Sequence, residues 1–278
     1  MDLFAERGVS VEILTTGVGS SIVELAKKVA AKNYNIIVAG GGDGTISAVA
    51  SALVGHPRTR LGILPLGTLN HFARDVCIPA DIAEAVDVIC AGHTEEIDVG
   101  SVNDKYFLNN SSVGLYPAVV KLRESLQSTG YGNWWAAALS SLRMLVRLRR
   151  LELEIRSSTG LPIKSRTALL FVGNNVYETS PAKLGTRLSI QGGTLWINLS
   201  TASSRFRLFM SLLALIMGRE RSENTLVFEA EELDVVIRKR LVTVALDGGV
   251  LSLTTPLNYR ILPKALSVIV PLSKTGGQ

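Results

Sequence analysis

A glycine-rich loop is the first feature of the sequence that could carry out chemistry. It consists of Gly40, Gly41, Gly42, Asp43, Gly44 and Thr45. The stretch before it, residues 36–39, is apolar throughout, as in a buried strand of a parallel sheet, and a helix is expected over residues 46–53. Glycines let backbone amides approach an anion closely, and a helix N-terminus adds partial positive charge. The loop is therefore a candidate phosphate-binding site.

This loop does not fit two familiar nucleotide-binding patterns. It lacks the Gly-Lys-Ser/Thr ending of a P-loop, and it lacks the third glycine of a dinucleotide fingerprint. A tight turn without a ligand stays an alternative for a glycine-rich turn of this kind.

A second segment favours the phosphate-binding interpretation. Residues 64–75 read LPLGTLNHFARD and follow another apolar stretch, residues 61–64. Consecutive parallel strands end at the same edge of a sheet, so both loops would face one crevice. Gly67, Thr68 and Asn70 would then line the pocket of the ligand that the first loop holds.

The order of the expected elements divides the chain at about residue 92. Before it, strands alternate with helices, which indicates βαβ units and a doubly wound parallel sheet in residues 1–92. The expected strands there are residues 9–15, 36–39 and 61–64, and the expected helices are residues 22–32, 46–53, 70–75 and 82–90. Beyond it short strands dominate, so residues 93–278 are expected to form a mostly antiparallel β domain. The C-terminal tail is a candidate for a return to the first domain.

The motifs GGGDGT and LPLGTLNHFARD resemble those of the diacylglycerol kinase catalytic-domain family, in its bacterial lipid kinase branch, which is distantly similar to NAD kinases. The likeness continues in residues 95–115, 172–177 and 246–271. The resemblance implies a nucleotide-binding α/β domain, a β-sandwich-like second domain, and phosphorylation of a lipid hydroxyl with ATP and Mg²⁺. It also implies that the first loop binds the nucleotide phosphates, with Asp43 positioning nucleotide and metal, and with the second loop lining the same pocket.

Three departures from the family pattern bear on activity. The chain opens with MDLFAERG, which looks like the end of the first helix of the family, so we expect the true start and a first strand to lie upstream. The Asp-Gly-Glu triplet of the family, whose glutamate is the presumed general base, ends here in Gly249. An acidic stretch tied to a metal site reads QGGTL at residues 191–195, so that structural metal is not expected.

Two further carboxylates are candidates, each with an alternative. Asp247 is the carboxylate nearest to the missing glutamate, and we expect it near the attacking hydroxyl as a partial substitute; an Asp-Gly hairpin turn is the alternative. Asp98 matches a family position beside the binding site, and the resemblance makes it a candidate ligand of metal or nucleotide. The alternative for Asp98 is an acid on the solvated surface.

Composition and charge narrow the range of partners. The 278 residues carry a formal net charge of +5, and 47 % of them are hydrophobic. No apolar run reaches the roughly 20 residues that span a bilayer, and the N-terminus lacks a signal-peptide core, so we expect a cytoplasmic protein. The basic excess suits an anionic partner, but no zinc-finger or RNP-type pattern points to nucleic acid. Cys77 and Cys90 are expected to be small buried hydrophobes.

Two expected helices could contact a membrane. Residues 134–149 begin with two tryptophans and end in arginines, and residues 206–217 form an apolar stretch flanked by arginines. This composition suits an interfacial helix on an anionic leaflet. Packing of both helices on the β domain, with the arginines solvated, is the alternative.

These features together predict an ATP- and Mg²⁺-dependent kinase of a diacylglycerol-like or related membrane lipid, cytoplasmic and peripheral at the inner membrane face. Two alternatives stay open. One is a catalytically impaired regulator that binds nucleotide or lipid. The other is a kinase of a soluble metabolite, because the GGDG loop also resembles that of NAD kinases.

Overall fold

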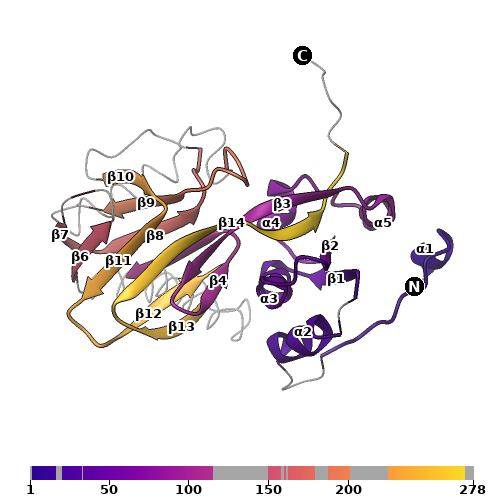
Figure 1. Ribbon diagram of the computed structural model, residues 1–278, viewed down its shortest axis with the longest axis horizontal. Helices are drawn as coiled ribbons and strands as arrows, with labels where there is room; N and C mark the ends of the chain where they lie inside the picture. Colours follow the sequence, from indigo (N-terminus) through magenta and orange to yellow (C-terminus); the bar gives the residue numbers. More distant parts are fainter. Residues whose placement is uncertain are drawn as a thin grey trace, which may run out of the picture. The chain divides into compact units, whose positions relative to one another are not determined.

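The computed structural model describes residues 2–16, 21–32, 34–114, 150–157, 160, 162–178, 187–200 and 225–272. The chain forms two compact units, Met1–Val99 with Leu262–Gln278 and Gly100–Ile261 (Figure 1). It passes from the first unit to the second within strand β3 (Thr94–Val102) and returns within β14 (Leu257–Ile269). β3 begins at Thr94, just after residue 92, and the crossing between the units lies within this strand, between Val99 and Gly100.

The first unit is built on a parallel sheet. Strand β1 (Ile36–Gly41) pairs in parallel with β2 (Arg60–Pro65), and Val268 of β14 pairs in parallel with Leu61 of β2. The helices are α1 (Asp2–Ala5), α2 (Ile22–Ala30), α3 (Asp43–Leu53), α4 (His71–Asp75) and α5 (Ile82–Ala91). Successive side chains of a strand point to opposite faces of the sheet.

Helices cover both faces of this sheet. An added Cβ at Gly62 of β2 would lie 3.2 Å from the side chain of Ile89, so α5 packs closely against that face. Helix α3 packs against β1, and Figure 1 shows α2 and α3 on the opposite side of β1 and β2 from α5. The predicted doubly wound α/β arrangement of this part is confirmed.

The second unit is a sandwich of two antiparallel sheets. One has the strand order β14–β11–β6–β7, and the other has the order β10–β9–β8–β5–β12–β13. The strands are β4 (Lys105–Phe107), β5 (Asn110–Gly114), β6 (Leu151–Ser157), β7 (Ile163–Thr167), β8 (Leu169–Asn174), β9 (Leu195–Ser200), β10 (Thr225–Ala230), β11 (Glu232–Ile237), β12 (Leu241–Leu246) and β13 (Gly249–Thr254). Inward side chains such as Val235 and Leu257 from one sheet, and Leu170 and Val244 from the other, join one hydrophobic core. The predicted β-sandwich-like domain is confirmed.

Some expectations from the sequence differ from the structure. Residues 9–15 form no strand, because a strand needs a hydrogen-bonded neighbour and no described strand pairs with this segment. The expectation of buried cysteines is wrong, since Cys77 and Cys90 are both free and exposed. Cys77 follows α4 with a left-handed φ of 57°, which carries it out of the helical register. The two expected basic helices, residues 134–149 and 206–217, lie outside the described residues.

Tyr259 couples the two sheets of the sandwich. Its side chain is fully buried, and its hydroxyl shares a hydrogen bond of 2.9 Å with Ser111 Oγ on β5. Burial raises the pKa of Tyr259 well above its ordinary value, because the phenolate would lose its hydration. The unfolded chain ionises this tyrosine near pH ~10. The stabilising effect of the buried neutral phenol is therefore complete below that pH and is lost as the pH rises above it.

Tyr259→Phe is expected to reduce the free energy of unfolding by about 1 kcal/mol at neutral pH, because the hydrogen bond to Ser111 is lost. The variant should lose less stability than the wild type between neutral and strongly alkaline pH, since phenylalanine cannot ionise. Urea unfolding at both pH values measures the two differences. If the wild type and Tyr259→Phe lost the same amount of stability at alkaline pH, ionisation of Tyr259 would not be the cause.

Candidate nucleotide-binding site

The two glycine-containing loops of the first unit meet backbone to backbone. Gly41 of β1 is in register with Pro65 of β2, and the Leu66 amide donates to the Gly41 carbonyl at 3.1 Å. A Cβ added to Gly67 would lie 2.4 Å from the Cα of Gly42. Only glycine at position 67 allows this approach. The adjacency of the two loops follows from the parallel pairing, as the sequence argument required.

Helix α3 begins at Asp43 rather than at Ile46, so the second half of the loop is the first helical turn. Its N-cap is Gly42, which has no side chain to cap the helix. The amides of Thr45 and Ile46 bond to the Gly42 carbonyl, whereas the first amides of any helix have no intrahelical partner. Asp43 and Gly44 therefore place uncapped amides at a positive helix end, and Gly44 is exposed there. Such an end binds phosphate.

The Asp43 side chain links the two loops. Its Oδ1 accepts a hydrogen bond of 3.2 Å from the amide of Phe72, in the first turn of α4. Within the described part of the chain, its Oδ2 accepts no hydrogen bond. One carboxylate oxygen thus holds the second loop in place, and the other is available to a cation. Thr68 next to this link is exposed.

Asn70 closes the second loop on itself. Its backbone is left-handed, with φ of 49°. Its Oδ1 accepts from the Gly67 amide at 3.0 Å, and its Nδ2 donates to the carbonyls of Pro65 at 3.1 Å and Gly67 at 2.8 Å. Asn70 therefore shapes the loop from within, which the sequence, expecting a pocket-lining group, did not indicate.

Asn70→Asp is expected to destabilise the protein more than Asn70→Gly. Glycine keeps the left-handed backbone without strain but loses three side-chain hydrogen bonds, at a cost of about 1–3 kcal/mol. Aspartate also replaces the Nδ2 donor by a carboxylate oxygen that faces two carbonyls. Thermal unfolding of both variants shows which of them is less stable. An Asn70→Asp protein as stable as the wild type would show that these bonds do not hold the loop.

Asp247 lies in a two-residue hairpin of the second unit. Asp247 and Gly248 connect β12 to β13 with φ of 46° and 86°, as a type I′ turn requires. Its carboxylate accepts hydrogen bonds from the amides of Leu108, Asn109 and Asn110 at 2.7, 2.8 and 3.1 Å. This geometry matches the turn alternative and anchors the hairpin to the start of β5. A role of Asp247 near the attacking hydroxyl stays a prediction.

Asp98 is buried, with 1 % of its surface exposed, so it is not the solvated acid of the alternative interpretation. Its Oδ1 accepts a hydrogen bond of 2.9 Å from the amide of Lys264. Lys264 is left-handed, with φ of 52°. The carboxylate thus supports an irregular residue within β14. Its role as a ligand of metal or nucleotide stays a prediction.

Part of the chain is similar in sequence to known kinases. Residues 1–102 match the family model described as the diacylglycerol kinase catalytic domain. A diacylglycerol kinase of Staphylococcus aureus (strain JH9) is 32 % identical over 160 residues, which are 57 % of this chain and 50 % of that protein. The chain therefore spans about half the length of the curated relatives it matches.

Solved structures resemble the chain in fold over most of its length. A crystal structure of a diacylglycerol kinase from Bacillus anthracis has a TM-score of 0.70 and 22 % identity, and it covers 98 % of this chain and 89 % of its own. Yeast NADH kinase, solved with NADH, has a TM-score of 0.51 and 12 % identity. The match covers 87 % of this chain and 63 % of the NADH kinase chain. Both likenesses concern the fold alone. The predicted similarity to NAD kinases is confirmed at that level.

Two of the three departures from the diacylglycerol kinase pattern lie in the second unit. Gly249, where the pattern has glutamate, is exposed at the start of β13. In the stretch at residues 191–195, the Thr194 amide donates to Asn175 Oδ1 at 3.3 Å, and Asn175 is left-handed with φ of 66°. The described residues contain no group of three acids, histidines or cysteines arranged to hold a metal, and none of their helices is long and apolar enough to cross a bilayer.

Proposed function

We propose that the protein is an ATP-dependent lipid kinase that transfers the γ-phosphoryl group to a hydroxyl of a diacylglycerol-like or related membrane lipid. The close contact of Gly42 with Gly67 supports this proposal most strongly. Neither of these two positions carries a side chain, and both lie beside the N-terminus of α3. A phosphate chain fits such a surface, since it needs close amides rather than apolar walls.

Different residues of the first unit would contact different parts of ATP. The amides of Asp43 and Gly44 would bind phosphate oxygens, with Gly40, Gly41 and Thr45 supporting the turn. Gly67 and Thr68 would line the opposite side, in the loop that Asn70 holds in shape. Asp43 Oδ2 would help to hold a Mg²⁺ ion, because hard cations take carboxylate and phosphate oxygens. The ion would neutralise charge on the phosphates. Phosphoryl transfer depends mainly on such positioning and charge stabilisation.

The lipid acceptor is inferred from the relatives. The Staphylococcus aureus protein named diacylglycerol kinase shares 32 % identity with this chain over 160 residues. A lipid substrate requires access to a membrane, so we propose a cytoplasmic protein in peripheral contact with an anionic leaflet. The basic excess of +5 suits that contact.

One observation favours a second candidate, a catalytically impaired protein that binds nucleotide. Gly249 offers no carboxylate, and the carboxylate of Asp247 is engaged by three backbone amides. A positioned general base contributes about 10²–10⁴-fold to rate. The second candidate would keep the ATP site and lack measurable transfer.

Asp43→Asn tests the proposed function. The amide Oδ1 of asparagine can still accept from Phe72, so the loops should keep their arrangement, but the charge for Mg²⁺ is lost. We expect phosphate transfer from labelled ATP to lipid to fall about 10²-fold or more, with little change in thermal stability. Asp43→Ala should lose both transfer and the link to α4. The exposed Asp104, in the turn before β4, gives the matched control Asp104→Asn. Equal activity of the Asp43→Asn and Asp104→Asn proteins would refute the role.

A further inference from the structure

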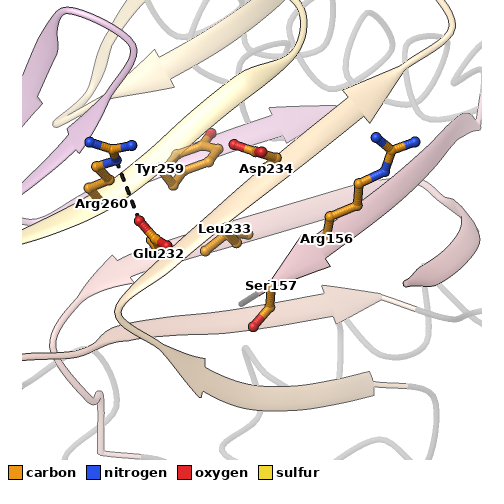
Figure 2. Close-up of a pocket in the computed structure, with 7 residues that line it drawn as sticks. All are labelled: Arg156, Ser157, Glu232, Leu233, Asp234, Tyr259 and Arg260. Carbon is orange, nitrogen blue, oxygen red and sulfur yellow. Dashed lines mark ion pairs between the residues drawn. The ribbon is translucent and has the colours of Figure 1, made fainter. Parts of the chain in front are cut away.

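Two hollows lined by described residues of the second unit differ in charge balance. The first, of about 290 Å³, lies over β6, β11 and β14 (Figure 2). Its acids have partners: Glu232 pairs with Arg260 at 3.6 Å, and Asp234 Oδ1 accepts from Asn258 Nδ2 at 2.6 Å. This hollow carries its own counter-charges and gives no reason to expect a charged ligand.

The second hollow, of about 340 Å³, combines aromatic and acidic side chains. It is lined by Val176, Tyr177, Glu178, Leu188, Trp196, Val227, Phe228 and Glu229. Gly173 of β8 pairs with Trp196 of β9, which pairs in turn with Glu229 of β10. Directly paired residues project from the same face of a sheet. The indole and the Glu229 carboxylate therefore stand side by side above the sheet.

The aromatic part of this hollow is fixed in place. The Tyr177 ring lies over Gly173, where an added Cβ would come within 2.6 Å of the ring. Its centroid is 5.8 Å from that of Trp196, with the planes inclined by 37°, and Phe171 stands edge-on to both rings. The Tyr177 hydroxyl donates to the Asn109 carbonyl at 2.9 Å, which fixes the ring further. Tyr177 is buried, with 9 % of its surface exposed, and Trp196 is half-buried, so Tyr177 supports an indole that reaches the surface before any ligand arrives.

The acidic part is uncompensated among the described residues. Neither Glu178 nor Glu229 forms an ion pair within that part of the chain. The Thr194 hydroxyl donates to Glu229 Oε2 at 3.0 Å, which orients this carboxylate without neutralising it. The hollow is therefore a locally negative, aromatic-lined site on a chain whose net charge is +5.

We propose that this second hollow binds an organic ammonium group. Faces of tryptophan and tyrosine attract cations, and they favour alkylated ammonium groups, whose weak hydration is readily removed. Glu178 and Glu229 supply the opposite charge, and Val176 and Leu188 supply apolar contact for methyl groups. The same chemistry occurs in choline-type lipid head groups and in free soluble amines. The proposal does not depend on kinase activity, because it concerns a separate ligand.

Titration with choline, followed by calorimetry, tests this site directly in the absence of ATP. The comparison ligand is 3,3-dimethyl-1-butanol, in which carbon replaces the nitrogen and the charge is removed. We expect choline to bind at least about tenfold more tightly than this neutral analogue. Glu229→Gln and Trp196→Leu should each weaken choline binding by about tenfold. Asp234→Asn, in the first hollow, is the matched control and should leave choline binding unchanged.

Binding to lipid vesicles distinguishes a lipid head group from a free amine as the source of the ammonium group. Capture by phosphatidylcholine vesicles that exceeds capture by phosphatidylglycerol vesicles, and that is lost in Glu229→Gln, assigns the site to a lipid head group. Choline binding without such capture assigns it to a free amine. The proposal is overturned if choline and its neutral analogue bind equally, or if folded Glu229→Gln, checked by circular dichroism, binds choline like the wild type.

Discussion

Replacing Gly249 with glutamate is expected to raise the rate of phosphate transfer to lipid by about 10²–10⁴-fold, the contribution of a positioned general base. The position can accept the side chain. Gly249 is exposed, its φ lies outside the left-handed region, and the nearest atom to an added Cβ is the Leu246 carbonyl oxygen at an ordinary 3.5 Å. Asp247 is a poor substitute, because three backbone amides engage its carboxylate.

Initial rates with labelled ATP measure the effect of Gly249→Glu. Ser252→Glu provides the control, because Ser252 is exposed on the same strand and lies on the opposite face from Gly249. The rate constant kcat should rise in Gly249→Glu alone. An equal, small change in both variants would mean that position 249 is not where a base acts.

Gly67→Ala is expected to weaken ATP binding by at least about tenfold, because overpacking of about 1–3 kcal/mol must be relieved by moving one loop. The added Cβ would lie 2.4 Å from the Cα of Gly42 and 2.7 Å from Asn70 Oδ1. The first of these atoms belongs to the backbone, so no side-chain rotation removes the clash. Movement of Gly42 would displace the N-terminus of α3 and the amides proposed to bind phosphate.

Calorimetric titration with ATP and Mg²⁺, together with thermal unfolding, measures both consequences of Gly67→Ala. Gly160→Ala is the control for the loss of a glycine, since an added Cβ at Gly160 meets no atom within 4 Å and its φ is not left-handed. Gly160→Ala should bind ATP like the wild type. Wild-type affinity in Gly67→Ala would show that the contact of the two loops does not form the nucleotide site.

The two glycine-containing loops could be predicted from the sequence because the information that specifies them is local. A glycine-rich turn after an apolar stretch predicts a strand end, and parallel pairing then brings the next strand end beside it. The start of α3 was placed three residues too late, since Asp43-Gly44-Thr45 suits a turn as well as a first helical turn. Asn70 was identified as a site residue, but its role within its own loop depends on a left-handed backbone.

The roles of the other carboxylates could not be predicted because their partners are far away in the sequence. Asp247 is bound by amides of residues 108–110, and Asp98 by the amide of Lys264. Strands β5 and β7 have a weak sequence signal for a related reason. Asn110–Gly114 is mostly polar, and Ile163–Thr167 is short and charged or polar at every position but the first, so each is stabilised as a strand by its neighbours in the sheet.

Transfer of label from γ-labelled ATP to diacylglycerol in mixed micelles, with and without Mg²⁺, tests the central claim most directly. The account predicts a labelled lipid whose formation by the wild type is slow, requires Mg²⁺, and rises with Gly249→Glu. Binding of ATP by both proteins with no labelled lipid from either, in diacylglycerol or in a mixed lipid extract, would contradict the claim that this chain is a lipid kinase.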